Sequence, residues 1–163
     1  EFLAVSAGNA GRAIPELALI ALMAAAIGVG LVNLVVALAI LGIPPILTNT
    51  YVGISQVDRA SVEAARGMGM TAGQILRSAE IPLATPLLMS GIRVAFSQVI
   101  ATATLGAFVG YNTLGRFITV GRANQDDGML YGGVVVIVAT ALAADGALRL
   151  LTRKSLRWRN PER

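Results

Sequence analysis

The sequence feature that most constrains the fold is an apolar run over residues 17–47. Within this run, Asn33 is the one residue with a strongly polar side chain. A single straight helix of this length would extend about 46 Å, whereas the hydrocarbon core of a bilayer is about 30 Å thick. The run is therefore either one strongly tilted membrane helix or two short ones.

We favour two helices, over residues 14–30 and 31–50. Gly28 and Gly30 weaken a helix at the expected break. The pair Pro44-Pro45 is expected to kink or end the second helix near its exit from the membrane.

The composition agrees with a membrane protein, since 55% of the 163 residues are hydrophobic and only 13% are charged. Two further apolar spans are expected, over residues 83–109 and 129–148. We therefore predict an all-α fold, a polytopic transmembrane bundle that forms a single domain over residues 1–163. The chain contains neither cysteine nor histidine, which excludes disulfides, a thiolate nucleophile and a Cys/His metal site.

Positive charge predicts the orientation, because loops rich in Lys and Arg stay in the cytoplasm. A polar segment over residues 55–82 carries three arginines, and a basic tail over residues 149–163 carries several more. The 110–128 loop has Arg116 and Arg122 but also two aspartates. We expect the polar segment and the tail to be cytoplasmic. The chain begins with Glu and shows no signal peptide, so we expect an N-terminal portion with a first span to be missing.

The polar segment predicts two short helices joined by a glycine turn. Asp58 is a suitable cap for the first helix, and Gly67 and Gly69 stop or bend it. Thr71 and Gln74 have the spacing of a capping box at the start of the second helix. Pro82 is expected to mark the handover to the next span.

Two short helices joined by a glycine turn can serve one of three functions. A DNA-binding helix-turn-helix is disfavoured, because the charges of the segment cancel and membrane spans flank it on both sides. The segment is either a knob that docks into a groove of a partner protein or an ordinary solvated loop. The residue pattern by itself leaves both open.

A resemblance favours docking. The pattern E-A-A, three residues, G, nine residues, I, one residue, L-P is typical of the EAA loop in permease subunits of ATP-binding-cassette (ABC) importers. This chain resembles it with Glu63-Ala64-Ala65, Gly69, Ala79 and Ile81-Pro82; Ala79 and Ile81 replace Ile and Leu. The resemblance implies a coupling helix that sits in a cleft of a cytoplasmic ABC ATPase dimer. The implied coupling residues are Glu63, Ala64, Ala65, Arg66, Gly67 and Gly69.

The resemblance also implies the remaining partners and the solute. Stretches such as "PPILTNTYVGI" and "SGIRVAFSQVIATATLGAFVG" resemble the branch that imports glycine betaine, choline and carnitine. A second permease copy or paralogue and an extracytoplasmic solute-binding protein are implied, in a bacterial or archaeal plasma membrane. ATP and Mg²⁺ would be bound by the ATPase, and this chain, which has no phosphate-binding G-x-x-x-x-G-K-[ST] motif, is expected to be no enzyme and to carry no cofactor. Alternatives are an importer of methionine or another small solute, an ATP-independent carrier or channel, and a membrane scaffold.

Polar residues inside the spans are candidates for the translocation path or for hydrogen bonds between helices. We assign Ser97, Gln98 and Thr102 as possible path residues, with interhelical bonding as the more common role. Arg93 is expected to be structural, and Asp145, the one acid that we place inside a span, is expected to pair with Arg149. A carrier would need paired intramembrane carboxylates, so support for one is thin.

The 110–128 loop is expected to face the outside. Tyr111, Leu114, Phe117 and Ile118 suggest a short amphipathic element at the outer interface. Arg116 and Arg122 are possible contacts for the solute-binding protein.

Overall fold

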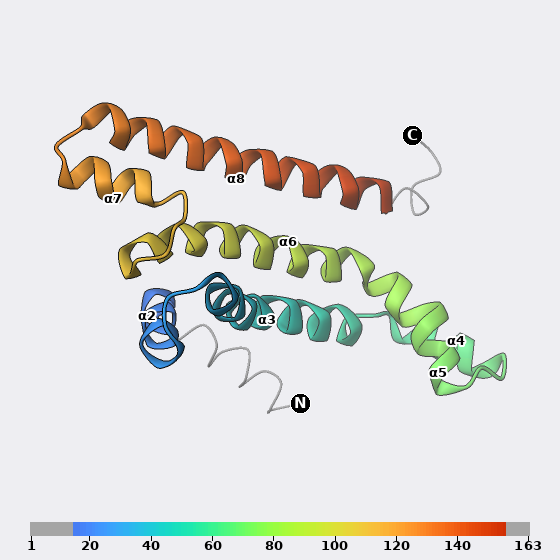
Figure 1. Ribbon diagram of the computed structural model, residues 1–163. Coiled ribbons are helices and arrows are strands. Elements are labelled where there is room, and N and C mark those ends of the chain that lie inside the picture. Colours follow the sequence, from blue (N-terminus) through green and yellow to red (C-terminus); the bar gives the residue numbers. More distant parts are fainter. Residues whose placement is uncertain (1–14, 156–163) are drawn as a thin grey trace.

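The computed structural model describes residues 15–155, so Arg12 and the last eight residues of the basic tail lie outside the described part. The chain is all-helical over these residues (Figure 1). The elements in order are α2 (Glu16–Ile27), α3 (Leu31–Ser55), α4 (Arg59–Gly67), α5 (Ala72–Ile75), η1 (Leu76–Glu80), α6 (Ile81–Leu105), η2 (Gly106–Val109), α7 (Arg116–Ala123) and α8 (Asp127–Ser155).

Three helical stretches are long and apolar enough to cross a membrane: Leu31–Ser55, Ala72–Val109 and Asp127–Leu150. Together α3, α6 and α8 run side by side along the length of the molecule (Figure 1). The expected all-α membrane bundle is therefore confirmed for the described part of the chain.

The break in the long apolar run is also confirmed. Helix α2 ends at Gly28, whose φ of 96° is open to glycine and strained for other residues. Gly30 then precedes α3 in extended conformation. However, α2 has only twelve residues and a length of about 18 Å, so it is too short to span a bilayer alone. It crosses the end of α3 instead of running along it (Figure 1).

The proline pair does not end α3, contrary to the alternative that the sequence left open. Pro44 and Pro45 lie inside the helix, which continues to Ser55. The Asn49 side chain donates a hydrogen bond to the Pro45 carbonyl at 2.8 Å. This carbonyl lies one turn before Asn49, so the bond fixes the Asn49 side chain against its own helix.

Glycines bring α3 and α6 close together. A Cβ atom at Gly91 would lie 2.6 Å from Asn49 Cβ, and one at Gly53 would lie 3.1 Å from Leu87 Cβ. Small residues allow such close approach between membrane helices, where packing replaces the hydrophobic effect as the main attraction. This contact is the main body of the bundle.

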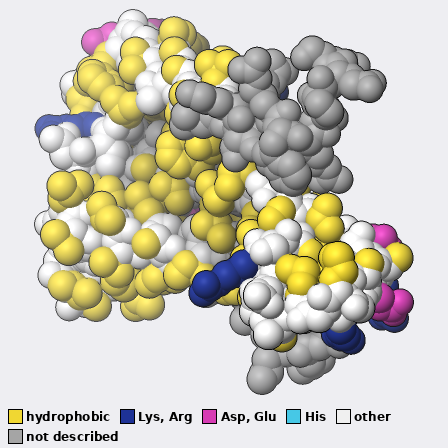
Figure 2. All heavy atoms as spheres, turned by 90° about the vertical axis from the view of Figure 1, so that its right-hand side faces the viewer, with side chains coloured by type: hydrophobic (Ala, Val, Ile, Leu, Met, Phe, Trp, Pro, Cys, Tyr) yellow, Lys and Arg dark blue, Asp and Glu magenta, His cyan; other side chains and the backbone are white. Residues whose placement is uncertain are grey.

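Helix α8 packs on the rest of the molecule through limited contacts. Its apolar side chains Val135, Val138 and Leu142 are each at least half exposed. Hydrophobic side chains also dominate the surface that Figure 2 presents, with charged side chains confined to small groups. A surface of this kind suits lipid or a further protein chain.

The handover from the polar segment to the next span differs from the expectation. Pro82 marks no break, because α5, η1 and α6 form one continuous helical stretch from Ala72 to Val109. Residues Leu76–Glu80 form a π-helical turn just before Pro82. Such a turn often accompanies a kink in a continuing helix, and the ribbon bends here (Figure 1).

The 110–128 loop contains helix α7, which packs against the start of α8. A Cβ atom at Gly121 would lie 2.7 Å from the Leu130 nitrogen, and one at Gly133 would lie 2.5 Å from Phe117 Cβ. Of the four residues expected in a short amphipathic element, Phe117 and Ile118 lie in α7, whereas Tyr111 and Leu114 precede it. Tyr111 is 4% exposed and joins the core cluster of Ile20, Leu34, Ala37 and Leu38.

Candidate functional site

The polar segment begins with a capped helix. Asp58 precedes α4, and its carboxylate accepts hydrogen bonds from the Ala60 backbone N–H and the Ser61 hydroxyl, each at 3.2 Å. These bonds satisfy a backbone donor that a helix start otherwise leaves open. The cap expected from the sequence is confirmed.

A tight turn separates α4 from α5. Helix α4 ends at Gly67, and Gly69 has a φ of 80°, in the region that favours glycine. The Gly69 N–H donates to the Arg66 carbonyl at 3.0 Å, which closes the turn. Neither Gly67 nor Gly69 has an atom within 4 Å of the place where a Cβ would sit. The turn therefore projects away from the rest of the chain.

The start of α5 has the capping box that its sequence predicts. Gln74 Oε1 accepts hydrogen bonds from the Thr71 N–H at 2.8 Å and from the Thr71 hydroxyl at 3.1 Å. Ala65 of α4 and Ile75 of α5 are 4% and 5% exposed. The two short helices thus have a small apolar contact region of their own and hold the turn in a defined shape.

The structure brings five of the six coupling residues to one exposed surface. Glu63, Ala64, Arg66, Gly67 and Gly69 are exposed on α4 and the turn. Ala65 is the exception: it faces inward, so it supports the segment and is not available to a partner.

Sequence reasoning missed Met68, which lies between the two glycines and is 75% exposed. A flexible, polarizable thioether at a projecting tip can adapt to an apolar hollow on a partner. The sequence did contain a signal for this exposure, because Met68 lies between Gly67 and Gly69, which favour a turn. A hollow of about 280 Å³ lies beside the tip, between the end of α3 and the charged residues Arg59, Glu63, Arg66 and Glu80.

A second polar group lies within the bundle and joins α2 to α6. Gln98 Nε2 donates to Glu16 Oε1 at 2.8 Å, and the Thr102 hydroxyl donates to Glu16 Oε2 at 2.5 Å. Thr102 is fully buried. Ser97, the third residue assigned as a possible path residue, is exposed and does not join this group. Sequence reasoning overlooked Glu16, so Asp145 is not the one acid within the apolar helices.

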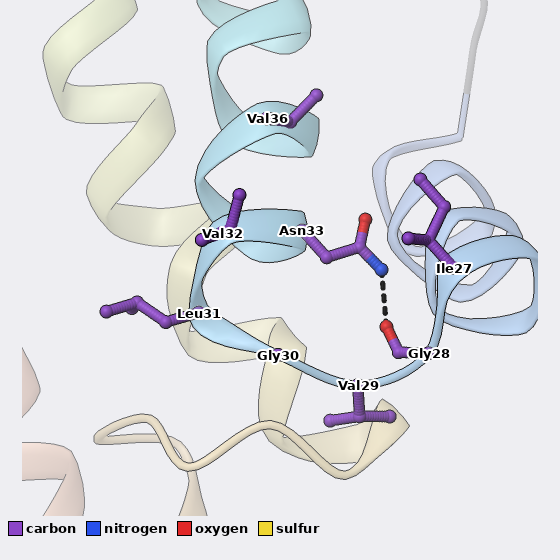
Figure 3. Close-up of a pocket in the computed structure, with 8 residues that line it drawn as sticks. All are labelled: Ile27, Gly28, Val29, Gly30, Leu31, Val32, Asn33 and Val36. Carbon is purple, nitrogen blue, oxygen red and sulfur yellow. Dashed lines mark hydrogen bonds between the residues drawn. The ribbon is translucent and has the colours of Figure 1, made fainter.

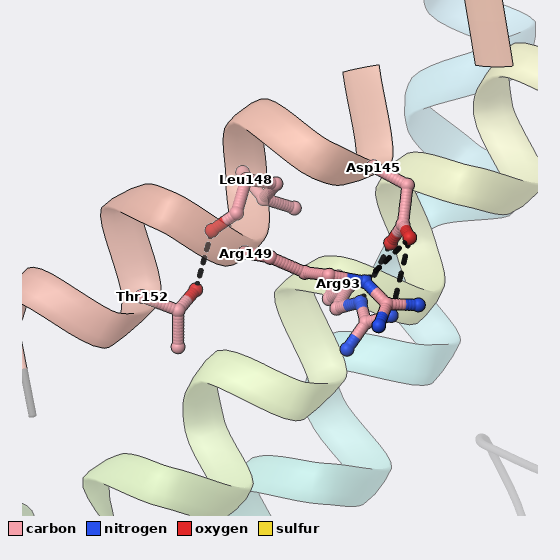
Figure 4. Close-up of polar contacts among 5 residues, drawn as sticks. All are labelled: Arg93, Asp145, Leu148, Arg149 and Thr152. Atoms are coloured by element: carbon pink, nitrogen blue, oxygen red, sulfur yellow. Dashed lines mark hydrogen bonds and ion pairs between the residues drawn. The ribbon is translucent and has the colours of Figure 1, made fainter. Parts of the chain in front are cut away.

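Arg93 and Asp145 form an ion pair that ties α6 to α8 (Figure 4). Arg93 Nε lies 2.7 Å from Asp145 Oδ1, and Arg149 Nε lies 2.7 Å from Asp145 Oδ2. The expected pairing of Asp145 with Arg149 and the structural role of Arg93 are both confirmed. Their shared carboxylate was not foreseen, because Arg93 and Asp145 are 52 residues apart.

Asn33 holds the break between α2 and α3 (Figure 3). Its side-chain amide donates to the Met23 carbonyl at 2.7 Å and to the Gly28 carbonyl. The Gly28 carbonyl follows the end of α2 and has no partner within that helix, so the Asn33 amide joins the helix end to the first turn of α3. An apolar hollow of about 350 Å³ lies beside the break, lined by Ile27, Val32, Val36 and their neighbours.

Arg116 and Arg122 are both exposed on α7, as a docking role requires. Arg116 Nη1 lies 3.5 Å from Asn112 Oδ1. The two arginines lie at the end of the bundle opposite the polar segment (Figure 1).

The family model for the binding-protein-dependent transport system inner membrane component matches residues 5–157. The chain is 38% identical to the glycine betaine/carnitine/choline transport system permease protein OpuCB of Bacillus subtilis over 146 residues, 90% of this chain and 67% of that protein. It is 37% identical to the osmoprotectant import permease protein OsmY of Salmonella typhimurium, over 90% of this chain and 62% of that protein.

The fold also resembles a chain of the MetNI methionine ABC transporter, solved in inward-facing conformations. The TM-score is 0.80 at 22% sequence identity, and the match covers 92% of this chain and 73% of that one. This likeness shows that the helices share the arrangement of an ABC importer permease. Together with the family match over residues 5–157, it places the chain: it belongs to the family of inner membrane components of binding-protein-dependent transport systems.

Proposed function

We propose that this chain is the permease subunit of an ATP-driven importer for quaternary-amine osmoprotectants. The observation that carries the solute class is that the relatives of this chain are permeases for glycine betaine, carnitine and choline. Those relatives share 37–38% of their residues with this chain over 84% or more of its length. A chain of a methionine importer has the same fold at 22% identity. The fold by itself therefore does not distinguish one solute class from another.

The mechanism we propose couples the polar segment to an ATPase on the cytoplasmic side. The tip formed by Gly67, Met68 and Gly69 projects from the bundle with open space around it. Glu63 and Arg66 flank it with one charge of each sign, which suits polar contacts at the rim of a cleft. Closure of the ATPase dimer on ATP would push this tip and rock the attached spans between inward-open and outward-open states.

Membership of this family suggests which subunit binds ATP and which forms the passage. ATP and Mg²⁺ would be bound by the separate ATPase, and this chain supplies the passage. The described residues, 15–155, provide three membrane-length helices, which are too few to enclose a passage, so we propose a two-fold pair with a second copy or a paralogue. A solute-binding protein would deliver the amine at the end that carries α7, with Arg116 and Arg122 among its contacts.

Uptake in a host that lacks its own osmoprotectant importers tests the solute. The complete transporter is expected to accumulate labelled glycine betaine, choline or carnitine and to leave labelled methionine outside. Accumulation of methionine with no accumulation of any of the three amines would replace the osmoprotectant assignment.

Two variants at the tip test the coupling. Met68→Asp places a charge where an apolar hollow is expected and should release the ATPase from purified complexes, whereas the matched control Met68→Leu should retain it. Gly69→Trp should abolish uptake while membrane insertion stays normal. Normal uptake by Gly69→Trp, or full ATPase retention by Met68→Asp, would contradict the coupling role.

A further inference from the structure

The carboxylate of Glu16 is held by neutral groups. Both of its oxygens accept hydrogen bonds from α6, one from Gln98 and one from Thr102. The ion pairs of the described residues, 15–155, both involve Asp145 and not Glu16. Glu16 therefore brings a negative charge into an apolar bundle without a cation from that part of the chain.

An isolated carboxylate in a membrane is costly, and such residues mark ion or solute sites more often than structural ones. Two neutral donors orient the carboxylate, and its place in the first turn of α2 adds the positive end of that helix dipole. These groups reduce the cost, but they leave the net charge in place. The arrangement suits a cation that binds reversibly. A permanent structural charge is instead expected to have a permanent partner, as Asp145 has.

The position along α6 places this group far from the polar segment. Thr102 lies 21 residues after Ile81, the first residue of α6, which corresponds to about 32 Å along a helix. Glu16 is therefore near the end of the bundle where α7 lies and where a solute-binding protein would release its solute.

A buried tyrosine lies in the same region. Tyr111 joins the cluster of Ile20, which follows Glu16 by one turn of α2. The Tyr111 hydroxyl is buried and has no hydrogen-bond partner among residues 15–155. An aromatic ring and a carboxylate are the two kinds of group that attract a quaternary ammonium ion, which has no N–H to donate.

We propose that Glu16 is the intramembrane counter-charge for the quaternary ammonium group of the solute, with Gln98 and Thr102 as positioning residues. The solute class rests on the proposed function, but the cation site rests on the geometry of Glu16. The site would accept the amine at the outer end of the passage and favour a positive group over a negative one.

Single-cysteine labelling tests the cation site without transport. The chain has no cysteine, so Gln98→Cys introduces one reactive thiol beside Glu16. In the assembled transporter, the rates of labelling by a thiosulfonate reagent with a trimethylammonium group and by one with a sulfonate group are compared. The thiolate is itself an anion and favours the cationic reagent, so the measure is the change in the ratio of the two rates when Glu16→Gln is added. That ratio should fall by about tenfold, as expected for the loss of a nearby negative charge. An unchanged ratio, or no labelling by either reagent, would overturn the site.

Uptake by a matched set of variants tests the role in transport. Glu16→Gln should lower amine uptake by about tenfold or more, while the transporter still assembles with its partner subunits. Thr102→Val should raise the KM for uptake, whereas Thr104→Val, which removes a hydroxyl bonded within its own helix, should not. Normal uptake by Glu16→Gln would exclude the role.

Two further outcomes separate this inference from its alternatives. Arg12→Gln should leave uptake intact; a loss equal to that of Glu16→Gln would make Arg12 the counter-charge and remove the solute from this site. If the unaltered transporter imports none of the amines, the proposed solute is wrong, and the labelling preference still decides whether Glu16 forms a cation site.

Discussion

Gly91 of α6 lies directly against Asn49 of α3, so close that a Cβ atom at position 91 would come within 2.6 Å of Asn49 Cβ. Asn49 is itself fixed by its hydrogen bond to the Pro45 carbonyl. The neighbour therefore cannot give way without loss of that bond. This contact and the one at Gly53 bring the two central helices to their short separation.

The first prediction follows from this contact. Gly91→Ala should destabilise the purified protein by about 1–3 kcal/mol, the usual effect of overpacking a tight contact. A thermal unfolding curve in detergent measures it. Gly132→Ala is the matched control, since no atom lies within 4 Å of a Cβ at that helical position, and its melting temperature should stay the same or rise slightly. Equal stability of the two variants would contradict the close contact.

The second prediction concerns the tie between α6 and α8. Asp145→Asn leaves two arginines without their anion and should lower the melting temperature more than Arg149→Gln, because the Arg149 side chain is 58% exposed and solvent screens its pair. The exchange Arg93→Asp with Asp145→Arg should restore part of the loss. No recovery in the double variant would show that the two residues act independently.

The third prediction concerns the backbone at the turn of the polar segment. Gly69→Ala adds a Cβ that meets no atom but strains a φ of 80°, so it should cost about 1 kcal/mol. Gly73→Ala, also in open space but inside α5, should cost nothing. Hydrogen exchange over residues 59–75 should rise only in the Gly69 variant, and similar exchange in both would remove the strain argument.

The fourth prediction concerns α7. Replacing Arg116 and Arg122 with glutamate should weaken association with the solute-binding protein, because both charges are exposed and rim charges act mainly on the association rate. Surface-immobilised transporter and soluble binding protein measure that rate at low and moderate salt. Unchanged rates at low salt would exclude these arginines from the contact.

Local signals in the sequence were reliable where one short stretch decides the structure. Asp58 caps α4, Thr71 and Gln74 form their box, and the chain breaks at Gly28 because neighbouring residues fix each of these features. The family match supports the same polar segment. Its coupling residues came from the resemblance to the EAA loop, because the residue pattern by itself left a docking knob and a solvated loop both open. The inward side chain of Ala65 and the exposed Met68 were not anticipated.

Contacts between distant residues could not be read from the sequence. Glu16 accepts a hydrogen bond from Thr102, which lies 86 residues later in the sequence. The residues near Glu16 do not indicate which helix will supply its hydrogen-bond donors. The same holds for Arg93, whose partner lies on another helix. The helix boundary predicted at Pro82 was wrong for a different reason. Proline often marks a helix boundary, but here the π-helical turn before it allows the helix to continue.

The continuous passage from the turn into α6 has a mechanical consequence. Helix α6 has 25 residues and a length of about 37 Å. If α6 rotates as a rigid body about the π-helical turn, a rotation of about 5° displaces its far end by about 3 Å, because the displacement is the helix length multiplied by the angle. That displacement is about the length of a hydrogen bond, so it is enough to separate Thr102 from Glu16. A small movement of the polar segment at one end of the bundle would therefore break a hydrogen bond at the other end.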